Sequence, residues 1–555
     1  MKTHPYDNAD FVVSFYDTFP EFLTGIDREY GPRPALSWFT RKQEQHTLTY
    51  HELTRQVFSL RRALLSRGLI PGSHVAIVSE NSANWIICFL AIACCGCVAV
   101  CVDIEQSDDS IRDMIRRADA NIVFCSQTFL PICSPLLEDC ANISHVVLME
   151  EGPGRPLVTP VAELYELGAS LPESTLPLCV SSDQAVELVF TSGTTSQSKM
   201  VLLSQGAVMQ NLCDSSSYIH FFQSIFCSLP FYHTYGLNCA VLGAFLRGTH
   251  LYMNGNLKTT MRDLKLAGPD TILTVPLMVE VLHNQLWLSA EQAGKADELR
   301  RALKLGVIFK KLHLPRSGKL LPQLKQALVG NLRLIICGGA HLSQAILEEF
   351  DLLGIQMLQG YGITECAPLI SVNCNYDNKI GSVGRPLPSC QIKLHQGEIL
   401  VKSPHIMQGY YKDPAQTAAV LKDGWFFTGD LGHLDKDEFL YITGRKKNLI
   451  VFKNGKKVSP EKLEELISAI PMVKEVVISG TLNGELADEV KLTASIFPDS
   501  RWTEGLSSYE ILECLQQNIN KINQTLPAYE QVQLVNIREK EFHKTASKKI
   551  KRHAN

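Results

Sequence analysis

The stretch Phe190-Thr-Ser-Gly-Thr-Thr-Ser-Gln-Ser-Lys-Met-Val-Leu-Leu-Ser204 guides the interpretation of the whole chain. It follows the apolar run Ala185–Phe190, which predicts a buried strand. Hydroxyl side chains and Gly193 then crowd together, and Lys199 closes the segment. Small residues let backbone N–H groups approach an anion, hydroxyls donate hydrogen bonds, and lysine adds positive charge. The segment indicates a phosphate-binding loop or an ordinary Ser/Thr-rich turn, and it differs from the common G-x-x-x-x-G-K-[ST] loop.

Segments further along the chain decide between these interpretations. They read Gly360-Tyr-Gly-Ile-Thr-Glu-Cys-Ala-Pro368, Gly424-Trp-Phe-Phe-Thr-Gly-Asp-Leu-Gly432, Tyr441-Ile-Thr-Gly-Arg-Lys-Lys-Asn448 and Lys544-Thr-Ala-Ser-Lys-Lys-Ile-Lys-Arg552. In order and spacing, the set resembles the AMP-forming adenylating superfamily, which includes acyl-CoA synthetases, peptide-synthetase adenylation domains and luciferases. The resemblance covers nearly the whole chain. It implies an α/β fold with a large N-terminal domain of layered αβ subdomains and a small antiparallel subdomain, followed by a small mobile α+β C-terminal domain.

The resemblance also implies a reaction in two half-steps, adenylation of a carboxylate by ATP and then transfer of the acyl group to a thiol. Glu365 would bind Mg²⁺, a hard cation that prefers oxygen ligands. Thr364 would face the α-phosphate, and Tyr361 would stack on adenine. The residues implied to hold the β- and γ-phosphates are Thr191, Ser192, Gly193, Thr194, Thr195 and Lys199.

Further nucleotide and acyl contacts follow from the same resemblance. Gly338, Gly339 and Ala340 would let the base and the acyl group approach the backbone closely. Asp430 would accept hydrogen bonds from the ribose hydroxyls, and Arg445 would reach the ribose or a phosphate. Taken alone, Asp430 also fits an ordinary turn aspartate, so its role rests on the motif around it.

Two more motifs complete the implied site. Lys549 would neutralise the charge that develops as carboxylate meets phosphate, although the basic tail around it also fits a solvated run of lysines. His233 and Gly236, in Leu229-Pro-Phe-Tyr-His-Thr-Tyr-Gly236, match a motif beside the acyl pocket, where His233 would gate the pocket. A lone histidine of this kind is otherwise a structural residue.

The pattern of strand-like and helix-like runs along the chain predicts the domain organisation. Strand-like runs such as Leu332–Ile336 alternate with helix-like runs such as His51–Arg67 through the first two-thirds of the chain. The alternation indicates α/β layers with largely parallel sheets. Short strands separated by turns follow between Gly381 and Thr443, and they predict a small antiparallel subdomain at about 386–446. The family resemblance places a hinge at Lys447, which predicts an N-terminal domain 1–446 and a C-terminal domain 447–555.

Composition limits the classes of partner and compartment. The net charge of −4 gives no global field for nucleic acid, so we expect none as a partner. The opening Met1-Lys-Thr-His-Pro-Tyr-Asp7 lacks the apolar core of a secretory signal, so we expect a cytoplasmic protein with reduced thiols. The apolar stretch Trp85–Val102 approaches transmembrane length, but Gly96 and the following Asp103 favour a buried helix, a turn and a buried strand.

A basic stretch at residues 295–333 allows two interpretations. Lysines and arginines are interleaved there with leucines and Ile308. Such a pattern is typical of a solvated helical surface, and it is also typical of a helix that lies on an anionic membrane. The stretch resembles the long-chain fatty-acid branch of the superfamily, whose substrates partition into membranes.

The leading hypothesis is an acyl-CoA synthetase that uses ATP, Mg²⁺ and CoA to activate a medium- or long-chain fatty acid. One alternative transfers the acyl group to the phosphopantetheine of a separate carrier protein, and another is a nucleotide-binding homologue without turnover. The last is suggested by Ser196, Ser198 and Met200, which stand where the family usually has Gly, Pro and Gly. Retention of Lys199 and of the other implied site residues favours an active enzyme.

Overall fold

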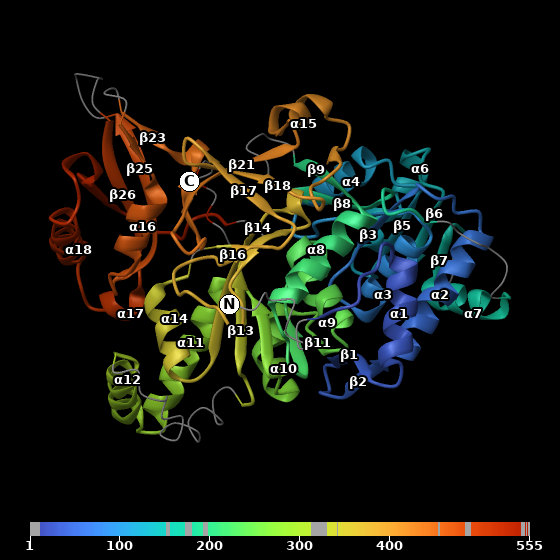
Figure 1. The fold of residues 1–555 in the computed structure, drawn as a ribbon, viewed down its shortest axis with the longest axis horizontal. Coiled ribbons are helices and arrows are strands. Elements are labelled where there is room, and N and C mark those ends of the chain that lie inside the picture. Colours follow the sequence, from blue (N-terminus) through green and yellow to red (C-terminus); the bar gives the residue numbers. More distant parts are fainter. Residues whose placement is uncertain are drawn as a thin grey trace. The chain divides into compact units, whose positions relative to one another are not determined.

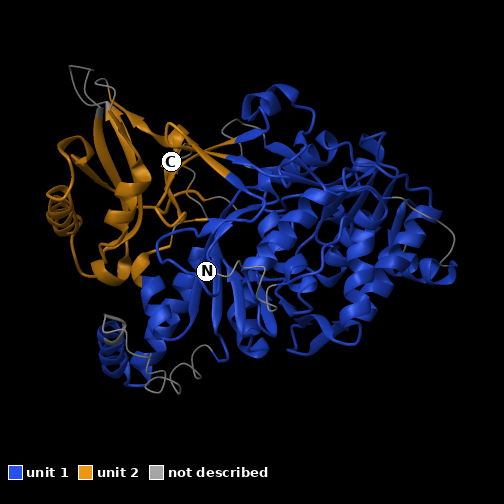
Figure 2. Ribbon diagram, viewed as in Figure 1, with its two compact units in different colours: residues 1–339, 346–391, 401–426 blue, residues 340–345, 392–400, 427–555 orange. Residues whose placement is uncertain are grey.

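The computed structural model describes residues 12–150, 152, 156–172, 180–191, 198–311, 330–340, 342–452, 456–482, 490–544, 550 and 552. The chain divides into two compact units, coloured in Figure 2. Unit 1 comprises residues 1–339, 346–391 and 401–426, and unit 2 comprises residues 340–345, 392–400 and 427–555. The α/β architecture with a large N-terminal part and a smaller C-terminal part, predicted from the sequence, is confirmed.

One eight-stranded sheet of unit 1 carries the strand that leads into the Ser/Thr-rich segment. Its order is β19-β9-β8-β4-β3-β5-β6-β7, parallel from β8 to β7, with β9 and β19 added antiparallel. The strands are β3 (His74–Val78), β4 (Val98–Cys101), β5 (Ile122–Cys125), β6 (His145–Leu148), β7 (Val158–Pro160), β8 (Ala185–Thr191), β9 (Lys199–Ser204) and β19 (Gly409–Tyr410). The predicted strand at 185–190 is therefore confirmed as β8.

A nine-stranded sheet forms the other half of unit 1, in the order β16-β15-β14-β13-β12-β10-β11-β1-β2. The strands from β14 to β1 are parallel, and β2, β15 and β16 are antiparallel. They are β1 (Pro34–Phe39), β2 (Gln45–Thr49), β10 (Ser224–Cys227), β11 (His250–Met253), β12 (Thr271–Thr274), β13 (Leu334–Gly338), β14 (Gln356–Gly362), β15 (Leu369–Val372) and β16 (Arg385–Pro386).

Strand β13 runs from Leu334 to Gly338, whereas the sequence predicted residues 332–336. The difference arises from its partner, because the backbone of Asp270, just before β12, accepts hydrogen bonds from the N–H groups of Arg333 and Leu334. The ladder with β12 starts only at Leu334, opposite Thr271. The later start carries the strand through Gly338, so the glycine segment begins inside the sheet.

Helices pack on the sheets of each unit, and in unit 1 they also separate the two sheets (Figure 1). The longer ones are α1 (Phe19–Tyr30), α2 (Tyr50–Ser66), α3 (Ala83–Cys94), α4 (Asp108–Arg117), α7 (Val161–Ser170), α8 (Gln205–Tyr218), α10 (Thr260–Ala267), α11 (Pro276–Gln292), α12 (Ala296–Lys311), α14 (Gln344–Leu352), α16 (Pro460–Ser468) and α18 (Ser508–Asn523). Helix α8 contacts β8 and β9 of one sheet and β15 of the other, so it lies between the two sheets. Shorter helical segments are α5 (Leu130–Cys133), α6 (Leu136–Asp139), α9 (Gly243–Leu246), α15 (Pro414–Val420) and α17 (Ser500–Thr503).

The apolar stretch at 85–102 folds as predicted. Helix α3 is buried along almost its whole length, Gly96 turns the chain with φ +67°, and β4 follows at Val98. Burial raises the pKa of the Cys94 thiol to about 12, as expected for packed rather than reactive cysteines. Among the described cysteines none forms a disulfide, and no helix built from described residues is long and apolar enough to cross a membrane.

Short strands dominate residues 391–445, as the sequence predicted. They form a five-stranded sheet of β17 (Gln391–His395), β18 (Glu398–Lys402), β20 (Leu421–Lys422), β21 (Trp425–Leu434) and β22 (Leu440–Arg445). Further along lie the hairpin of β23 (Ile450–Val451) with β24 (Lys457–Val458), and the sheet of β25 (Val473–Leu482), β26 (Val490–Pro498) and β27 (Leu534–Ile537). Helices α16 and α18 pack with this last sheet around a core that includes Leu463, Ile478 and Leu515.

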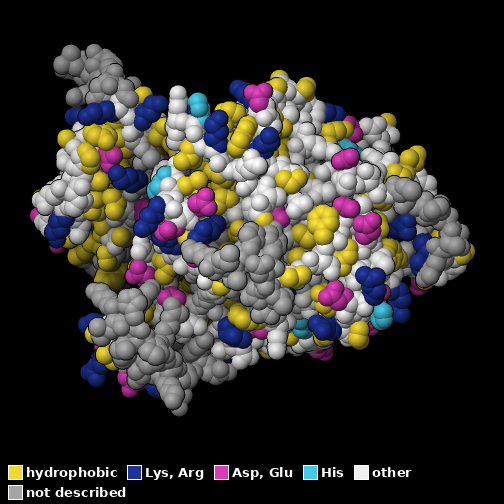
Figure 3. Space-filling model, viewed as in Figure 1, with side chains coloured by type: hydrophobic (Ala, Val, Ile, Leu, Met, Phe, Trp, Pro, Cys, Tyr) yellow, Lys and Arg dark blue, Asp and Glu magenta, His cyan; other side chains and the backbone are white. Residues whose placement is uncertain are grey.

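The surface carries both signs of charge. Figure 3 shows Lys and Arg side chains interspersed with Asp and Glu across the face in view. This mixture matches the small net charge of −4 over 555 residues. The face shown therefore presents no broad region of one charge that would attract a polyanion over a long range.

Candidate active site

The sequence-predicted residues of unit 1 gather near the carboxyl ends of parallel strands. Strand β10 is followed by Leu229–Gly236, and β13 ends at Gly338. Strands β10, β12 and β13 are neighbours in one sheet and run parallel, so these segments leave the same edge. Ligands of open α/β sheets bind outside the carboxyl ends of the strands, which makes this edge the candidate site.

The ends of the Ser/Thr-rich segment are placed by an antiparallel pair. Strand β8 ends at Thr191 and β9 begins at Lys199, and these two residues are register partners. The backbone oxygen of Ser198 accepts a hydrogen bond from Arg117 at 2.7 Å, which fixes the end of the segment. The other implied phosphate-binding residues, Ser192, Gly193, Thr194 and Thr195, lie outside the described residues. The structure thus places Lys199 directly opposite Thr191 at the mouth of the segment.

Tyr410 joins two of the predicted site residues. Strand β19 pairs antiparallel with β9, with Tyr410 opposite Val201. The Lys199 Nζ lies 4.5 Å from the centroid of the Tyr410 ring, and the Tyr410 hydroxyl donates to Glu365 Oε1 at 2.8 Å. Sequence reasoning missed Tyr410, although the adjacent aromatic pair Tyr410-Tyr411 after a glycine was a visible signal.

The Tyr410 hydroxyl remains protonated at neutral pH. Burial and the negative charge of Glu365 both raise its pKa well above the ordinary range of tyrosine. A neutral phenol is a hydrogen-bond donor, and the ionised carboxylate of Glu365 is an acceptor only. The contact therefore fixes the orientation of one Glu365 oxygen.

Glu365 lies in a short closed loop between two strands. Strand β14 delivers Tyr361, and the 3₁₀ helix η6 (Thr364–Cys366) follows directly. The N–H of Ile363 donates to Pro368 O at 2.9 Å, and a Cβ at Gly362 would lie 2.3 Å from the same oxygen. The loop therefore closes on itself so tightly that only glycine fits at position 362.

A second contact fixes the same loop from the 401–426 segment. The N–H of Met407 donates to the backbone oxygen of Glu365 at 2.8 Å. The side chain of Asn211, on α8, donates to the backbone oxygens of Cys366 and Leu369 at 3.2 and 2.7 Å. The middle and the C-terminal end of η6 are thus held by neighbouring segments, which fixes the backbone at Glu365.

The glycine segment after β13 is built for close approach. A Cβ at Gly338 would lie 3.2 Å from the Tyr235 ring and 3.5 Å from Gly360 O. Gly339 has φ +88°, a left-handed conformation that favours glycine, and Ala340 follows it. The chain therefore passes close to η4 (Tyr235–Leu242) and to strand β14 with little side-chain bulk. Close approach of a base or an acyl group to this segment stays a prediction.

The histidine motif leads into a π-helix, η4 (Tyr235–Leu242). A Cβ at Gly236 would lie 2.3 Å from Pro230 O, so no larger residue fits there without moving the backbone. The Tyr235 hydroxyl donates to Thr274 O at 3.1 Å, which ties η4 to the end of β12. His233 packs against the Tyr232 ring, with centroids 4.7 Å apart. π-Helical turns of this kind occur often at functional sites.

In unit 2, two predicted nucleotide contacts pair with each other. Asp430 on β21 and Arg445 on β22 are register partners, and Arg445 Nε lies 2.8 Å from Asp430 Oδ1. The Asp430 side chain is only 4 % exposed, whereas that of Arg445 is 45 % exposed. Lys447 lies just beyond, in the 3₁₀ helix η7 (Lys446–Asn448), and Lys549 lies outside the described residues.

No metal-binding cluster of three or more His, Cys, Asp or Glu side chains occurs among the residues that the structure describes. Glu365 therefore offers a single carboxylate. This arrangement fits Mg²⁺, which proteins commonly hold through one or two carboxylates together with substrate phosphates.

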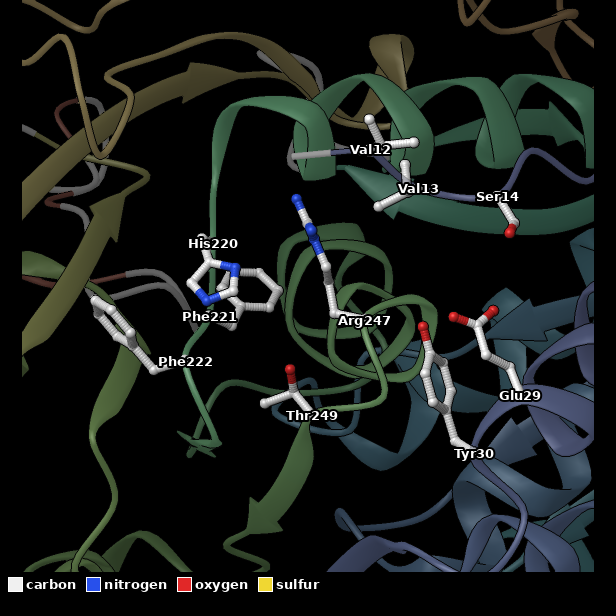
Figure 4. A pocket seen from close by; sticks show the side chains of 10 residues that line it. All are labelled: Val12, Val13, Ser14, Glu29, Tyr30, His220, Phe221, Phe222, Arg247 and Thr249. Carbon is white, nitrogen blue, oxygen red and sulfur yellow. The ribbon is translucent and has the colours of Figure 1, made fainter. Parts of the chain in front are cut away.

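A separate pocket of about 720 Å³ lies at the other edge of the nine-stranded sheet (Figure 4). Its lining residues include His220–Phe222, which precede β10, and Arg247 and Thr249, which precede β11. They stand at the amino ends of these parallel strands, opposite the carboxyl ends where the motif residues lie. This pocket is therefore distinct from the candidate active site.

Comparison with known proteins supplies the family. Residues 26–411 match the family described as AMP-binding enzyme, and residues 447–555 match its AMP-binding enzyme C-terminal domain. The chain belongs to the AMP-binding enzyme family. The resemblance inferred from its motifs is thereby confirmed.

Individual relatives are distant. A long-chain-fatty-acid–CoA ligase of Mycobacterium bovis is 27 % identical over 454 residues, which cover 78 % of this chain and 75 % of that protein. An indoleacetate–CoA ligase of Aromatoleum aromaticum is 26 % identical over 509 residues, covering 89 % and 91 %. Among solved structures, an anthranilate CoA ligase in complex with anthranoyl-AMP aligns with a TM-score of 0.78 at 18 % identity, covering 100 % and 98 %. The structural match shows that the fold is shared over the whole chain.

Proposed function

We propose that the protein is an AMP-forming acid–thiol ligase that converts a fatty carboxylate into its CoA thioester. The observation that carries the proposal is that Tyr410 contacts both Lys199, through its ring, and Glu365, through its hydroxyl. This contact brings the lysine that we propose binds phosphate close to the carboxylate that we propose binds the metal, within a chain of the AMP-binding family. ATP and CoA are the cosubstrates.

In the first half-reaction, a carboxylate oxygen of the substrate attacks the α-phosphorus of ATP, and the bond to the bridging oxygen of pyrophosphate breaks. Such transfers depend mainly on positioning and on neutralising charge. Lys199 and the segment from Thr191 hold the β- and γ-phosphates, Thr364 faces the α-phosphate, and Lys549 stabilises the charge where carboxylate and phosphorus meet. Tyr361 stacks on adenine beside the Gly338–Ala340 segment.

Mg²⁺ bound by Glu365 would neutralise phosphate charge during this step. The donor chemistry supports the assignment, because Tyr410 occupies only one oxygen of the carboxylate. On the ribose side, Asp430 would accept hydrogen bonds from the hydroxyls, and Arg445, already paired with it, would reach a hydroxyl or phosphate oxygen.

In the second half-reaction, the thiol sulfur of CoA attacks the acyl carbonyl, AMP leaves with the anhydride oxygen, and the thiol proton passes to solvent or buffer. We propose that a C-terminal domain 447–555 turns about Lys447 between the two steps, and that residues 453–459 then approach the acyl-adenylate. The family match at 447–555 supports this boundary. The N-terminal domain would span 1–446, with a small β subdomain at about 386–446.

The acyl group is a medium- or long-chain fatty acid in this proposal. The name of the mycobacterial relative supports a fatty substrate, whereas the name of the Aromatoleum relative points to an arylacetate. His233 would gate the acyl pocket and Gly236 would shape it, because His233 lies in the turn that leads into η4 and Gly236 lies in its first turn.

We also propose peripheral contact with an anionic membrane through α12, in an otherwise cytoplasmic protein. Helix α12 buries Leu299 and exposes Leu305, Val307 and Ile308, each more than 40 % exposed. Cations including Arg300 accompany these apolar side chains, as in helices that lie at lipid interfaces. Co-sedimentation with vesicles containing phosphatidylserine, but not with neutral vesicles, would support the contact, and binding to neither would reject it.

ATP–pyrophosphate exchange with carboxylic acids from acetate to palmitate, and with indoleacetate, tests the main proposal. We expect exchange to be greatest with fatty acids, and AMP release to require CoA. Release that requires an added phosphopantetheinyl carrier protein instead would favour the carrier as acceptor. A protein that binds ATP yet supports no exchange with any acid would be a non-catalytic homologue.

A further inference from the structure

A fully buried carboxyl group, Glu187, lies in the middle of β8. Its register partners across the sheet are Ala99 on β4 and Leu203 on β9, and neither of these two side chains is charged. Side chains of a strand alternate between its faces, which places Glu187 on the same face as Thr191. An apolar residue is the ordinary choice at such a central position, and the acid therefore requires an explanation.

The carboxyl group contacts the π-helix η4 through Asn238. Asn238 Nδ2 donates to Glu187 Oε2 at 3.2 Å and to the backbone oxygen of Ala367 at 3.3 Å. Ala367 belongs to the closed loop that carries Glu365, and it adopts a left-handed conformation with φ +66°. One amide group thus links the strand that feeds the phosphate segment, the helix after the histidine motif, and the loop of the metal-binding residue.

Two acceptors in this arrangement lack a donor. Among the described residues, neither Glu187 Oε1 nor Asn238 Oδ1 has a hydrogen-bond partner. An unsatisfied buried oxygen destabilises the folded state, and an ionised one does so more strongly. A neutral carboxylic acid supplies the missing proton, because its hydroxyl can donate to Asn238 Oδ1 while its carbonyl oxygen keeps the amide N–H.

Among the described residues, the titratable groups that interact with this carboxyl are thiols. Burial chiefly raises the pKa of Cys101 on β4 and of Cys239 on η4, and a negative charge on Glu187 would raise both pKa values further. Neither thiol supplies a positive charge that would stabilise a carboxylate. Burial raises the pKa of Glu187 to about 7, while the Asn238 hydrogen bond opposes the rise.

We propose that Glu187 is a positioning residue that acts as a neutral acid. Through Asn238, it holds the Glu365 loop in register with the strand that leads into the phosphate segment. This inference rests on the proposed function for its kinetic consequence, but its structural consequence stands apart from any activity. Glu187 touches no substrate and acts only through Asn238.

The matched pair of variants is Glu187→Gln and Glu187→Leu. Glutamine keeps a neutral group with a donor and an acceptor, so it can complete the amide pair with Asn238. Leucine fills much of the same volume but cannot form a hydrogen bond with Asn238. Asn238→Leu breaks the same link from the other side and serves if Glu187→Leu does not fold. The control for general loss of stability is Asp263→Asn. Asp263 is a buried carboxylate on α10 that accepts hydrogen bonds from Asn254 and Thr259.

Two measurements separate positioning from stability. In pyrophosphate exchange, we expect Glu187→Gln to stay within about threefold of the wild type, and Glu187→Leu to lose about tenfold to hundredfold in kcat with little change in KM for the acid. In amide hydrogen exchange, we expect peptides spanning residues 362–372 to exchange faster in Glu187→Leu and Asn238→Leu, but not in Glu187→Gln or Asp263→Asn.

The outcomes are distinguishable. Equal damage by Glu187→Gln and Glu187→Leu would overturn the neutral-acid assignment, because it would require the ionised form. Unchanged hydrogen exchange at 362–372 in Glu187→Leu and Asn238→Leu would overturn the positioning role. A wild type inactive with every acid would reject the proposed function, and the hydrogen-exchange result would still decide the role of Glu187.

Discussion

Tyr410 donates its hydroxyl hydrogen to Glu365 and lies under the ammonium group of Lys199. The tyrosine occupies a two-residue strand, β19, which pairs with the strand that begins at Lys199. The ring thus fixes a cation and a carboxylate at the same time, before any nucleotide arrives. This arrangement makes Tyr410 the residue whose alteration tests the unit 1 site most directly.

Tyr410→Phe should lower kcat for pyrophosphate exchange by about tenfold, because a hydrogen bond to a charged group typically contributes about 1.5–3 kcal/mol. Tyr410→Leu should lower it further, since the ring beneath Lys199 is also lost. The matched control is Tyr411→Phe, because the hydroxyl of Tyr411 donates to Asp119 at 2.8 Å and not to Glu365. Equal rates for Tyr410→Phe and the wild type would remove the hydroxyl from the positioning of Glu365.

Lys549→Ala should strongly slow adenylate formation and spare thioester formation from supplied acyl-adenylate. An electrostatic contact of this type contributes about 10²–10³ in rate, and the proposed contact exists only in the first step. Single-turnover assays of the two half-reactions measure the difference, with Lys548→Ala as the neighbouring control. Similar losses in both half-reactions would contradict the assignment.

Lys447→Pro should leave pyrophosphate exchange intact and depress thioester formation. Proline locks φ near about −65°, and a hinge must change its backbone dihedrals between the two steps. Lys447→Ala keeps the backbone free and should affect neither step. If Lys447→Pro supports both half-reactions at wild-type rates, the hinge lies elsewhere.

Met200→Gly should destabilise the protein, although the family usually has glycine at this position. Met200 is 6 % exposed and packs in a core that includes Leu188 and Phe190. Truncating such a side chain costs about 2–5 kcal/mol, and glycine within a strand adds about 0.5–1 kcal/mol. A fall in melting temperature for Met200→Gly, but not for Ser196→Gly, checks this prediction, and equal melting temperatures would contradict the burial.

Ser196→Gly then tests the phosphate segment by its effect on turnover. We expect only a modest change in turnover from a wild type that is already active. Activity that appears only in Ser196→Gly would show that the natural segment is impaired.

Stability should depend on pH through Glu187. Its pKa rises from 4.5 in an ordinary carboxyl to about 7 in the folded protein, so the native state binds more protons between these values. The free energy of unfolding therefore falls as pH rises from about 4.5 to 7, by roughly 3 kcal/mol, and changes no further above that window. Glu187→Gln should lack this part of the slope in denaturant unfolding at pH 4 and pH 8. Parallel pH profiles for the two proteins would show that Glu187 ionises normally.

Much of the fold was predictable from local pattern. The apolar run at 185–190 became β8, and the 3.6-residue periodicity at 51–67 became α2 (Tyr50–Ser66). Lys199, which the sequence placed at the end of a loop, is the first residue of β9, and Thr364 and Glu365 lie in the 3₁₀ helix η6. The roles of these residues in catalysis stay predictions.

Other parts of the site depend on pairing between strands that are far apart along the chain, so a short stretch of sequence does not reveal them. Strand β19 is too short to show a period, and its partner β9 lies far away along the chain. Met200 resembled a loop position in the motif, but the pairing of β9 with β8 buries it. Glu187 interrupts an apolar run, and only the approach of Asn238 from η4 gives its carboxyl a partner.

The pairing of β9 with β19 also restricts how this chain can be recombined with its relatives. A chimera that took residues 199–204 from one parent and 409–411 from another would have to re-form both the backbone ladder and the lysine–tyrosine contact across a parental boundary. Crossovers that enclose only residues 229–236 leave both strands with one parent. If residues 229–236 line the acyl pocket as proposed, acyl selectivity is best exchanged between homologues by grafting that segment alone. Strands β9 and β19 then come from the same parent.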